Sequence, residues 1–578
     1  MEERRLLLAI VLSVAILFAW QYFFPSPERE RITPEEPQTA ETYTATAESD
    51  VSGPEDEDVK ETAVTSPEKV DRQFVKGDLE PIEVSGPGTV EVETDLYRCV
   101  FSTRGGGIRA FELKNFRKER DPKSDSVELV DPALSNDLLP LGTEIMIGGK
   151  LLPVDAGFAV NTGNIDLVSE GSEDSAQLVM SLATRAGLEV KRRYTFKKGS
   201  YDLGFEIEIS ENPVGTTEGY LLKAMPVETS VMWNVLVDPE KAKGRFAFYG
   251  TVLKMGEKFE DRRIAEIRKK GPFTYKDVGW GGFADAYFLS ILIPAEKGTS
   301  KLVAGIEEID GVETITEELV LSAGEVTPNE KYLKKLNIYL GPKDHKLLSN
   351  MGNGLEDAIG YGRLKSLVVP LIWILRFFQK YVHNWGLAII LLTVFVKIVF
   401  FPLTRKSYES MKAMQALQPR IKELQEKYKD DREKMNSEMM ALYKAHKINP
   451  VGGCLPMLLQ LPVLYALYRA IYVSIELRHS PFIWWINDLS APEEIFAIPF
   501  FGGVEIGFMP LLMGASMYVQ QKMTPTATSD PMQAKMFMAM PVIFTFISFG
   551  FPSGLVLYWF VSNLLTIVQQ YVINRRGI

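Results

Sequence analysis

Long runs of apolar residues stand near the start of the chain and throughout its last third. The first run extends from Leu6 to Phe24, close to the roughly 20 residues that cross a bilayer core as a helix. The pattern predicts six membrane-spanning helices, with the last two joined by a tight turn at Pro552 and Ser553. The five later runs cover about 385–403, 454–474, 506–522, 536–551 and 554–573.

The first run has two interpretations, an uncleaved membrane anchor and a cleaved signal peptide. Arg4 and Arg5 precede it, and it continues through Trp20 to Phe24 with aromatic residues typical of a membrane interface. No small-residue cleavage site follows. The sequence therefore favours an N-terminal transmembrane anchor over residues 1–24.

The segment after the anchor is rich in Pro, Glu, Thr and Ser and poor in large apolar residues. Such a composition cannot bury a core. We therefore expect a disordered acidic linker over residues 25–79.

The pattern then changes to short strands. Apolar and polar residues alternate from Leu203 to Ile209, which is the period of a half-buried strand. Residues 188–196 supply a partner strand, and 197–201 supply the turn between them. Regular short strands and turns of this kind predict a large antiparallel β-sandwich domain over residues 80–345.

Two helical segments flank the second apolar run. Basic and large apolar residues mix in 363–378, which predicts an amphipathic helix on the membrane surface within a region 346–384. Residues 404–450 carry apolar positions at spacings of three and four, which predicts an antiparallel helical hairpin. The hairpin could be a solvated coiled coil joining two spans, or a docking arm for a ribosome, targeting factor or substrate. Its length favours the docking arm. Residues 385–578, hairpin included, form a predicted five-helix core.

Charge sets the expected orientation. The hairpin 404–450 carries 11 Lys and Arg residues, whereas the loop 475–505 is acidic. Positively charged loops face the cytoplasm, so both termini are expected there and residues 25–384 outside. Residues 1–345 have a net charge of −19 and residues 346–578 a net charge of +8. Because phosphate repels an acidic domain, the N-terminal part is not expected to bind DNA.

Side chains that support catalysis or metal binding are scarce. General acid–base work at neutral pH usually recruits histidine, and none of the four histidines lies within 80–342. The two cysteines, Cys99 and Cys454, fall in regions of different type, which argues against a disulfide. A large exported domain without disulfides fits a bacterial periplasm. We expect no enzyme activity, no cofactor and no metal.

One lysine interrupts the second apolar run. A charge at the centre of a bilayer helix costs about 2.5–3.5 kcal/mol on insertion scales. Lys397 could extend its side chain to the interface, or it could face a hydrated recess among the helices. Arg405 lies roughly 12 Å further along a helix, which makes the first option awkward. No predicted span carries an Asp or Glu near its centre, so a hydrated Lys397 would attract an acidic group from elsewhere.

The last third of the chain resembles the YidC family of membrane-protein insertases, the bacterial branch of the Oxa-type group. The anchor, linker and sandwich match the Gram-negative arrangement of that family. The blocks that carry the resemblance are NWGLAIILLTVFVKIVFFPLT, SYESMKAMQALQPRIKELQEKY, EMMALYKAHKINPVGGCLPMLLQLPVLYALY, IELRHSPFIWWINDLS, QQKMTPTATSDPMQAKMF, MPVIFTF and FPSGLVLYWFVSNLLTIVQQ.

The resemblance implies a hydrophilic groove that is open to cytoplasm and lipid and contains one cation, usually arginine. Lys397 takes that position here, so the charge remains but the bidentate fork is lost. Thr393 and Trp559 match groove positions too, and Gln460, Ser562 and Asn563 are further polar candidates. Flexible methionines near the third and fifth spans could form a slide for the apolar part of a substrate, or could simply face lipid. The candidates for this slide are Met513, Met517, Met536 and Met540.

The implied activity is insertion and chaperoning of nascent membrane proteins in the bacterial inner membrane, without ATP. Possible partners are the general secretion translocon, the ribosome and targeting factors, besides the lipid bilayer. A small-solute or anion transporter that uses the same lysine is an alternative, although no internal repeat supports it. A scaffold whose sandwich binds partners is another.

Overall fold

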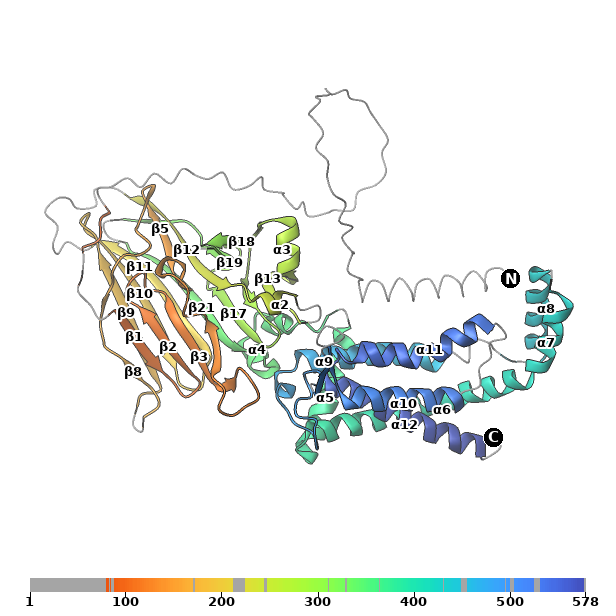
Figure 1. Ribbon diagram of the computed structural model, residues 1–578. Helices are drawn as coiled ribbons and strands as arrows, with labels where there is room; N and C mark the ends of the chain where they lie inside the picture. Colours follow the sequence, from red (N-terminus) through yellow and green to blue (C-terminus); the bar gives the residue numbers. More distant parts are fainter. Residues whose placement is uncertain are drawn as a thin grey trace, which may run out of the picture. The chain divides into compact units, whose positions relative to one another are not determined.

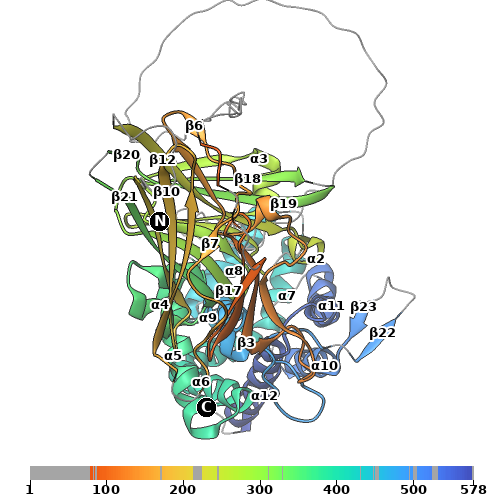
Figure 2. The same cartoon turned by 90° about the vertical axis from the view of Figure 1, so that its left-hand side faces the viewer.

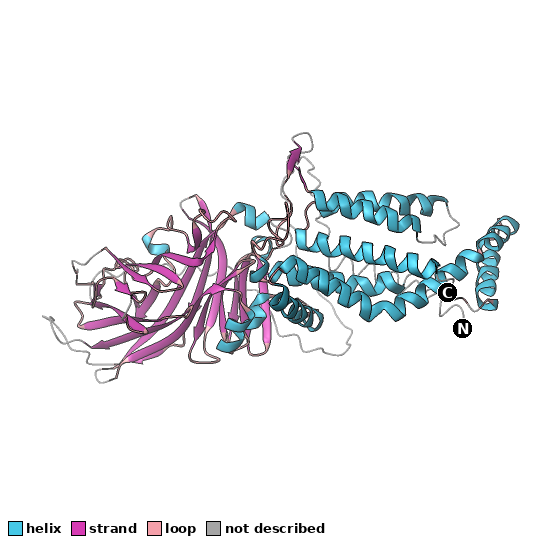
Figure 3. Ribbon diagram, turned by 90° about the horizontal axis from the view of Figure 1, so that it is seen from below, coloured by secondary structure: helices cyan, strands magenta, loops and turns pink. Residues whose placement is uncertain are grey.

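The computed structural model describes residues 79–578 with internal gaps, so the predicted anchor, the linker over 25–78 and Cys454 lie outside the described residues. Along the chain, the strands of the three large sheets come first and the long helices come after them. Figure 3 distinguishes the strands from the helices by colour. The gaps are 83, 85–87, 170–171, 212–223, 244–246, 310, 328–329, 363, 430, 447, 449–454, 494, 499–503, 524–530 and 576–578.

Three sheets build the first part. A five-stranded sheet has the order β4-β3-β2-β1-β8. Its strands are β1 (Thr89–Glu93), β2 (Tyr97–Ser102), β3 (Ile108–Arg117), β4 (Ser126–Val130) and β8 (Ile165–Asp166). Its β1–β8 pair is parallel, an exception to the antiparallel pairing predicted for the domain.

The largest sheet has nine strands in the order β14-β13-β16-β17-β21-β11-β10-β9-β7. Its strands are β7 (Ala159–Val160), β9 (Ser175–Ala183), β10 (Leu188–Lys197), β11 (Asp202–Glu211), β13 (Gly250–Met255), β14 (Lys258–Arg263), β16 (Trp280–Ala284), β17 (Phe288–Pro294) and β21 (Tyr332–Pro342). The predicted pairing of 188–196 with the strand after it is the β10–β11 hairpin, in which Tyr194 stands opposite Phe205.

The third sheet has seven strands, six of them in the order β15-β18-β19-β12-β5-β6 and the seventh, β20, beside β12. Its strands are β5 (Thr143–Ile147), β6 (Lys150–Leu151), β12 (Met225–Leu236), β15 (Phe273–Lys276), β18 (Lys301–Ile309), β19 (Val312–Val320) and β20 (Gly324–Val326). The short helices α2 (Pro239–Lys243) and α3 (Ile264–Lys270) stand between strands.

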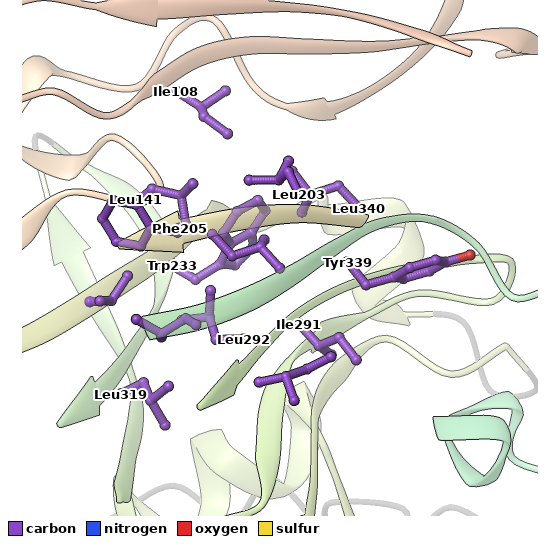
Figure 4. Packing of buried hydrophobic residues seen from close by; sticks show 14 of the residues in the cluster. Ile108, Leu141, Leu203, Phe205, Trp233, Ile291, Leu292, Leu319, Tyr339 and Leu340 are labelled. Atoms are coloured by element: carbon purple, nitrogen blue, oxygen red, sulfur yellow. The ribbon is translucent and has the colours of Figure 1, made fainter. Parts of the chain in front are cut away.

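The core of the sandwich follows from the alternation read in the sequence. Along β11 the residues at 203, 205, 207 and 209 are buried and those between them are partly exposed. They join one apolar cluster with residues of all three sheets, including Trp233, Ile108 and Leu319 (Figure 4). A buried carboxyl also lies in this interior: Glu317 on β19 is 1% exposed and faces the Thr251 hydroxyl of β13.

Short helices α4 (His345–Met351) and a 3-10 turn at Leu355–Ile359 lead into α5 (Lys365–Val382), which lies in the region predicted as amphipathic. One face of α5 buries Val368, Ile372 and Leu375. The other face exposes large aromatic side chains, with Trp373 at 72% and Tyr381 at 68%. Such a helix suits a membrane surface, since it offers aromatic rings on one side only.

The remaining helices are α6 (Trp385–Ala416), α7 (Gln418–Lys427), α8 (Arg432–Ala445), α9 (Leu455–Val473), α10 (Phe508–Met523), α11 (Pro531–Ser548) and α12 (Ser553–Arg575). Helix α12 contacts α6, α9 and α10, and Figure 1 shows α6, α10 and α12 side by side. The strands β22 (Phe496–Ile498) and β23 (Val504–Ile506) form a separate two-stranded hairpin between α9 and α10 (Figure 2).

Two helices among the described residues are long and apolar enough to cross a membrane, α6 and the part of α12 over Ser553–Ile573. The other predicted spans of this region coincide with α9, α10 and α11, which do not meet that test over the described residues. The count of six spans therefore stays a prediction.

The predicted hairpin differs from the observed helices in its first arm. Helix α6 does not end near residue 403 but passes through Pro402 to Ala416, and a break at Leu417 then separates it from α7. Proline removes one backbone donor from a helix but need not end it. The Thr404 hydroxyl donates to the Phe400 carbonyl at 2.9 Å, which supplies a local bond just beyond the proline. Helices α7 and α8 contact each other as the two arms (Figure 1).

Candidate functional site

Hydroxyl groups recur every fourth residue along one side of α12. Tyr558, Ser562 and Thr566 follow one another at intervals of four, which places them on the same face of the helix. We call these three residues the polar stripe. All three are buried, so each hydroxyl needs a partner inside the bundle.

Lys397 of α6 contacts one end of the polar stripe. Its Nζ donates to the Thr566 Oγ1 at 2.8 Å, while that hydroxyl donates to the Ser562 carbonyl at 2.7 Å. The acceptor is neutral, and Lys397 forms no ion pair with any carboxylate in the part of the chain that the structure describes. The ammonium is thus held by a group that leaves its charge uncompensated.

Gln460 of α9 contacts the other end of the polar stripe. Its Nε2 lies 2.7 Å from the Tyr558 Oη and 3.4 Å from the Ser562 Oγ. Since Ser562 and Thr566 are one turn apart, the stripe connects Gln460 with Lys397 through neighbouring hydroxyl groups. Lys397, Gln460 and Ser562, three of the residues proposed from the sequence, therefore share one line of polar contacts.

The other three proposed groove residues lie on different contacts. Thr393 is fully buried, and its hydroxyl donates to the Ile389 carbonyl of its own helix at 2.7 Å. Asn563 donates to the Ser516 hydroxyl of α10 at 3.0 Å. The Trp559 ring stands against Phe544 of α11, with ring centres 5.3 Å apart. Asn563 and Trp559 connect α12 with α10 and α11, whereas the Thr393 hydroxyl bonds within its own helix, so these contacts lie outside the polar stripe.

A cavity of about 370 Å³ adjoins Lys397 between α6 and α12. Most of its wall is apolar, and Lys397 and Gln569 supply the polar groups. The Gln569 Oε1 is buried and has no hydrogen-bond partner among the described residues. Ile398 and Val568 on the rim are 66% and 58% exposed, so this Lys397 cavity borders the outer surface of the helices. Its volume falls in the range of ordinary ligand pockets.

The four proposed slide methionines are not equally exposed. Met513 is fully buried in the apolar core of the helices, and Met517 packs partly buried against it. Met540 is partly buried, and the side chain of Met536 lies outside the described residues. Among the methionine side chains that the structure describes in α10 and α11, Met538 is exposed, at 61%.

Described residues of the loop over 475–505 contact the first turns of α12 and α10. Its Ala491 and Leu489 carbonyls accept from the first backbone N–H groups of α12, those of Ser553 and Gly554, at 2.8 and 2.9 Å. A side chain at residue 554 would place its Cβ 2.9 Å from the Leu489 oxygen, so this approach requires glycine. Glu493 does the same for α10, since its carboxylate accepts from the Met509 N–H at 2.9 Å and from the Trp485 indole at 3.2 Å.

Tyr558 is the residue of the polar stripe that sequence reasoning missed, whereas Thr566 is one of the polar side chains that the sequence offers as company for Lys397. The signal that finds both is their spacing from Ser562, four residues on either side. Alone, each resembles an ordinary side chain of a membrane helix.

Comparison with known proteins identifies the family. Residues 89–374 match the family model for the YidC periplasmic domain, and residues 377–578 match that for the 60Kd inner membrane protein. The membrane protein insertase YidC of Geotalea daltonii is 37% identical over 578 residues, which covers 99% of both chains. That of Pelobacter propionicus is 38% identical over 579 residues with the same coverage, and that of Syntrophus aciditrophicus is 37% identical over the whole of both chains. Two family models that divide the chain between them and relatives of matching length confirm the resemblance: the chain belongs to the YidC family of membrane protein insertases.

Proposed function

We propose that this insertase moves nascent membrane proteins into the bacterial inner membrane by offering the Lys397 ammonium to an acidic segment of the substrate. The observation that carries the proposal is the contact of Lys397 with a neutral hydroxyl beside an open cavity. Insertion is a transfer between environments and makes no covalent bond, so the chain is an insertase and not an enzyme.

The free energy of the lysine explains why an acidic substrate would be attracted. A buried cation without a counter-ion is costly, because a single hydroxyl replaces only part of its hydration. A substrate carboxylate arriving in the Lys397 cavity would form a charge-assisted bond, which is about twice as strong as a neutral one. The polar flank of the substrate would also travel a shorter distance through hydrocarbon, whose full thickness is about 30 Å.

The polar stripe would extend this path across the interior of the helices. A flank that leaves Lys397 finds the hydroxyls of Thr566 and Ser562 and then the amide of Gln460. The apolar segment of the same substrate would leave along the rim of the cavity, where Ile398 and Val568 are exposed.

The proposed topology follows the distribution of charge. Six spans would place both termini and the hairpin 404–450 in the cytoplasm and the sandwich in the periplasm. The hairpin is then available to a ribosome or targeting factor, and the amphipathic α5 lies along the outer leaflet. Membership in an insertase family, together with a sequence without internal repeats, speaks against the small-solute transporter.

The test is reconstitution of the purified protein in liposomes with a small single-span substrate that carries an acidic exported tail, scored by protease protection. Lys397→Ala is expected to slow insertion about tenfold, equivalent to roughly 1.4 kcal/mol. Lys397→Arg keeps the charge and should insert at nearly the normal rate. Lys412→Ala, an exposed lysine further along α6, serves as the matched control. Full insertion by Lys397→Ala would remove the lysine from the mechanism and leave the family assignment untouched.

A further inference from the structure

A second cavity lies far from the Lys397 cavity in the sequence, where the end of the sandwich meets α9. It is bordered by the last residue of β14, by Lys343 just after β21, by the turn at Gly360 and by the last turns of α9. Three of its lining side chains are cations, Arg263, Lys343 and Arg469. We call it the cation cavity.

Lys343 is the most deeply buried of the three, at 3% exposure. Among the described residues it forms no ion pair, and its Nζ lies 5.4 Å from the centre of the Phe248 ring. Burial lowers the pKa of Lys343 to about 8 against an opposing contribution from Asp285, while the charge of Arg469 lowers it further and Asp261 opposes it less than Asp285 does. Asp285 itself has Lys241 as a partner at 3.6 Å.

The two arginines donate to backbone carbonyls of residues that line the cavity. Arg469 donates from one Nη to the Gly360 carbonyl, but its buried Nε has no partner within the described residues. Gly360 has φ +74, a conformation that favours glycine and that turns its carbonyl toward the arginine. Arg263 donates to the Ala247 carbonyl at 2.9 Å, and burial lowers its pKa, with Arg469 as the next cause.

Charge in this cavity is therefore unbalanced. Three cations face a single lining carboxylate, Asp261, which is exposed. Like charges brought together away from water destabilise one another. An anion of the right size would be held by all three, because lysine offers a point charge and arginine a planar fork for phosphate oxygens.

The size of the cavity limits the anion. Its volume is about 40 Å³. Since roughly 10–15 Å³ accommodates one water, it has room for about three waters or one small tetrahedral oxyanion. Part of the wall is apolar and includes Phe248, Phe259 and Val473. A larger polar ligand would reach this part and find no polar group to contact there.

We propose that the cation cavity binds a phosphate group through Lys343, Arg263 and Arg469. Arg469 stands four residues before the end of α9, at the end of a predicted span. In the proposed topology this level belongs to the lipid headgroups of the outer leaflet, so the phosphate could be that of a phospholipid or a free ion. The bound anion would connect the sandwich to α9. This role of the cation cavity is independent of the role of Lys397.

The first experiment measures binding of radiolabelled inorganic phosphate to the delipidated full-length protein in phosphate-free detergent. We expect one phosphate per chain, with binding weakened about tenfold or more by Lys343→Met. Lys346→Met is the matched control, because that lysine is exposed only three residues away. Asp261→Asn removes the opposing carboxylate and should tighten binding, a gain that misfolding cannot produce.

The second experiment distinguishes the source of the phosphate. Native mass spectrometry of protein purified from membranes in phosphate-free buffer counts the phospholipids retained. Retention of one phospholipid by wild type and Lys346→Met but not by Lys343→Met would support a lipid headgroup. Binding of inorganic phosphate with no retained lipid would support a free anion. The proposal is overturned if wild type binds neither, or if Lys343→Met and Lys346→Met behave alike in both experiments.

Discussion

Two single residues show ionisable groups that have been taken out of water at a cost in free energy. The Lys397 ammonium donates to a hydroxyl. Glu317 lies in the sandwich interior, and neither of its carboxyl oxygens forms a hydrogen bond of normal geometry with a described residue. The sequence could predict that Lys397 was unusual, because it interrupts an apolar run. It could not predict the partner, because the rotation of α12 about its axis decides which of several hydroxyls faces the lysine.

The contact between Lys397 and Thr566 gives a prediction about positioning. Thr566→Val keeps the shape of the side chain and removes the acceptor, so the ammonium keeps its charge but loses its fixed place. Insertion of the acid-tailed substrate should slow by about threefold, less than for Lys397→Ala, since one neutral hydrogen bond is worth about 0.5–1.5 kcal/mol. Initial rates in the liposome assay measure it. Thr404→Val, which removes a hydroxyl bonded only to its own helix, should leave the rate unchanged.

Glu317 gives a prediction about pH. Burial raises the pKa of Glu317 from 4.5 to about 8. Between these values the folded protein holds a proton that the unfolded chain releases, so this residue makes stability fall as pH rises from about 4.5 to 8. Glu317→Gln should therefore raise the unfolding temperature at pH 8 more than at pH 5. Scanning calorimetry of the full chain checks this.

The control for that measurement is on the same strand. Glu313 is partly exposed and paired with Arg268, and this guanidinium lowers the pKa of Glu313. Glu313→Gln should bring no stabilisation at either pH. A gain from Glu317→Gln that was equal at pH 5 and pH 8 would contradict a neutral carboxyl in the folded state.

Whole elements were the part of the fold that the sequence predicted best. Period-two alternation predicted β10 and β11, and their register follows from the single buried face. The ends were predicted less well. Pro402 suggested the end of a span, yet α6 continues for 14 residues beyond it, because the helix-forming residues that follow outweigh one missing donor. The parallel β1–β8 pair had no signal, since β8 has two residues.

The start of α10 depends on one side chain of the loop over 475–505. Glu493→Ala removes the acceptor for the Met509 N–H and should lower the free energy of unfolding by about 1–2 kcal/mol. Glu493→Gln keeps an oxygen at the same place, and because burial raises the pKa of Glu493 the loss of its charge should cost little. Thermal unfolding in detergent compares the two variants. Equal losses would mean that the charge, and not the hydrogen bond, fixes the helix.

The molecule as a whole combines a sandwich and a set of helices that are connected by polar contacts. Lys254 of β13 pairs with Asp357 at 2.8 Å, and Arg478 donates to the Arg117 carbonyl at 2.7 Å. The sequence predicted both parts and their order, since each has its own hydrophobic period. It could not predict these contacts, because no residue pattern on the surface of the sandwich or of the helices specifies which residues of the other part lie opposite.

Insertion itself should reside in the helices. Removing most of residues 80–340 deletes the sandwich but leaves Lys397, the polar stripe and the Lys397 cavity. We expect the shortened chain to insert the acid-tailed substrate at no less than about half the normal rate, as the proposed electrostatic attraction is local. Protease protection in liposomes is the readout. Complete loss of insertion by a correctly folded truncated chain would place the activity in the sandwich.

The capping of α10 and α12 by a single loop has a mechanical consequence. The same loop holds the first residues of α10 and α12. If the two helices move apart, their separation is therefore smallest at this end and grows along the helices. Helix α12 has 23 residues and so is about 35 Å long. A tilt of about 5° would then move its far end by roughly 3 Å while the tied end stays still. A bundle fastened in this way opens further at the free ends of α10 and α12 than at the ends that the loop caps.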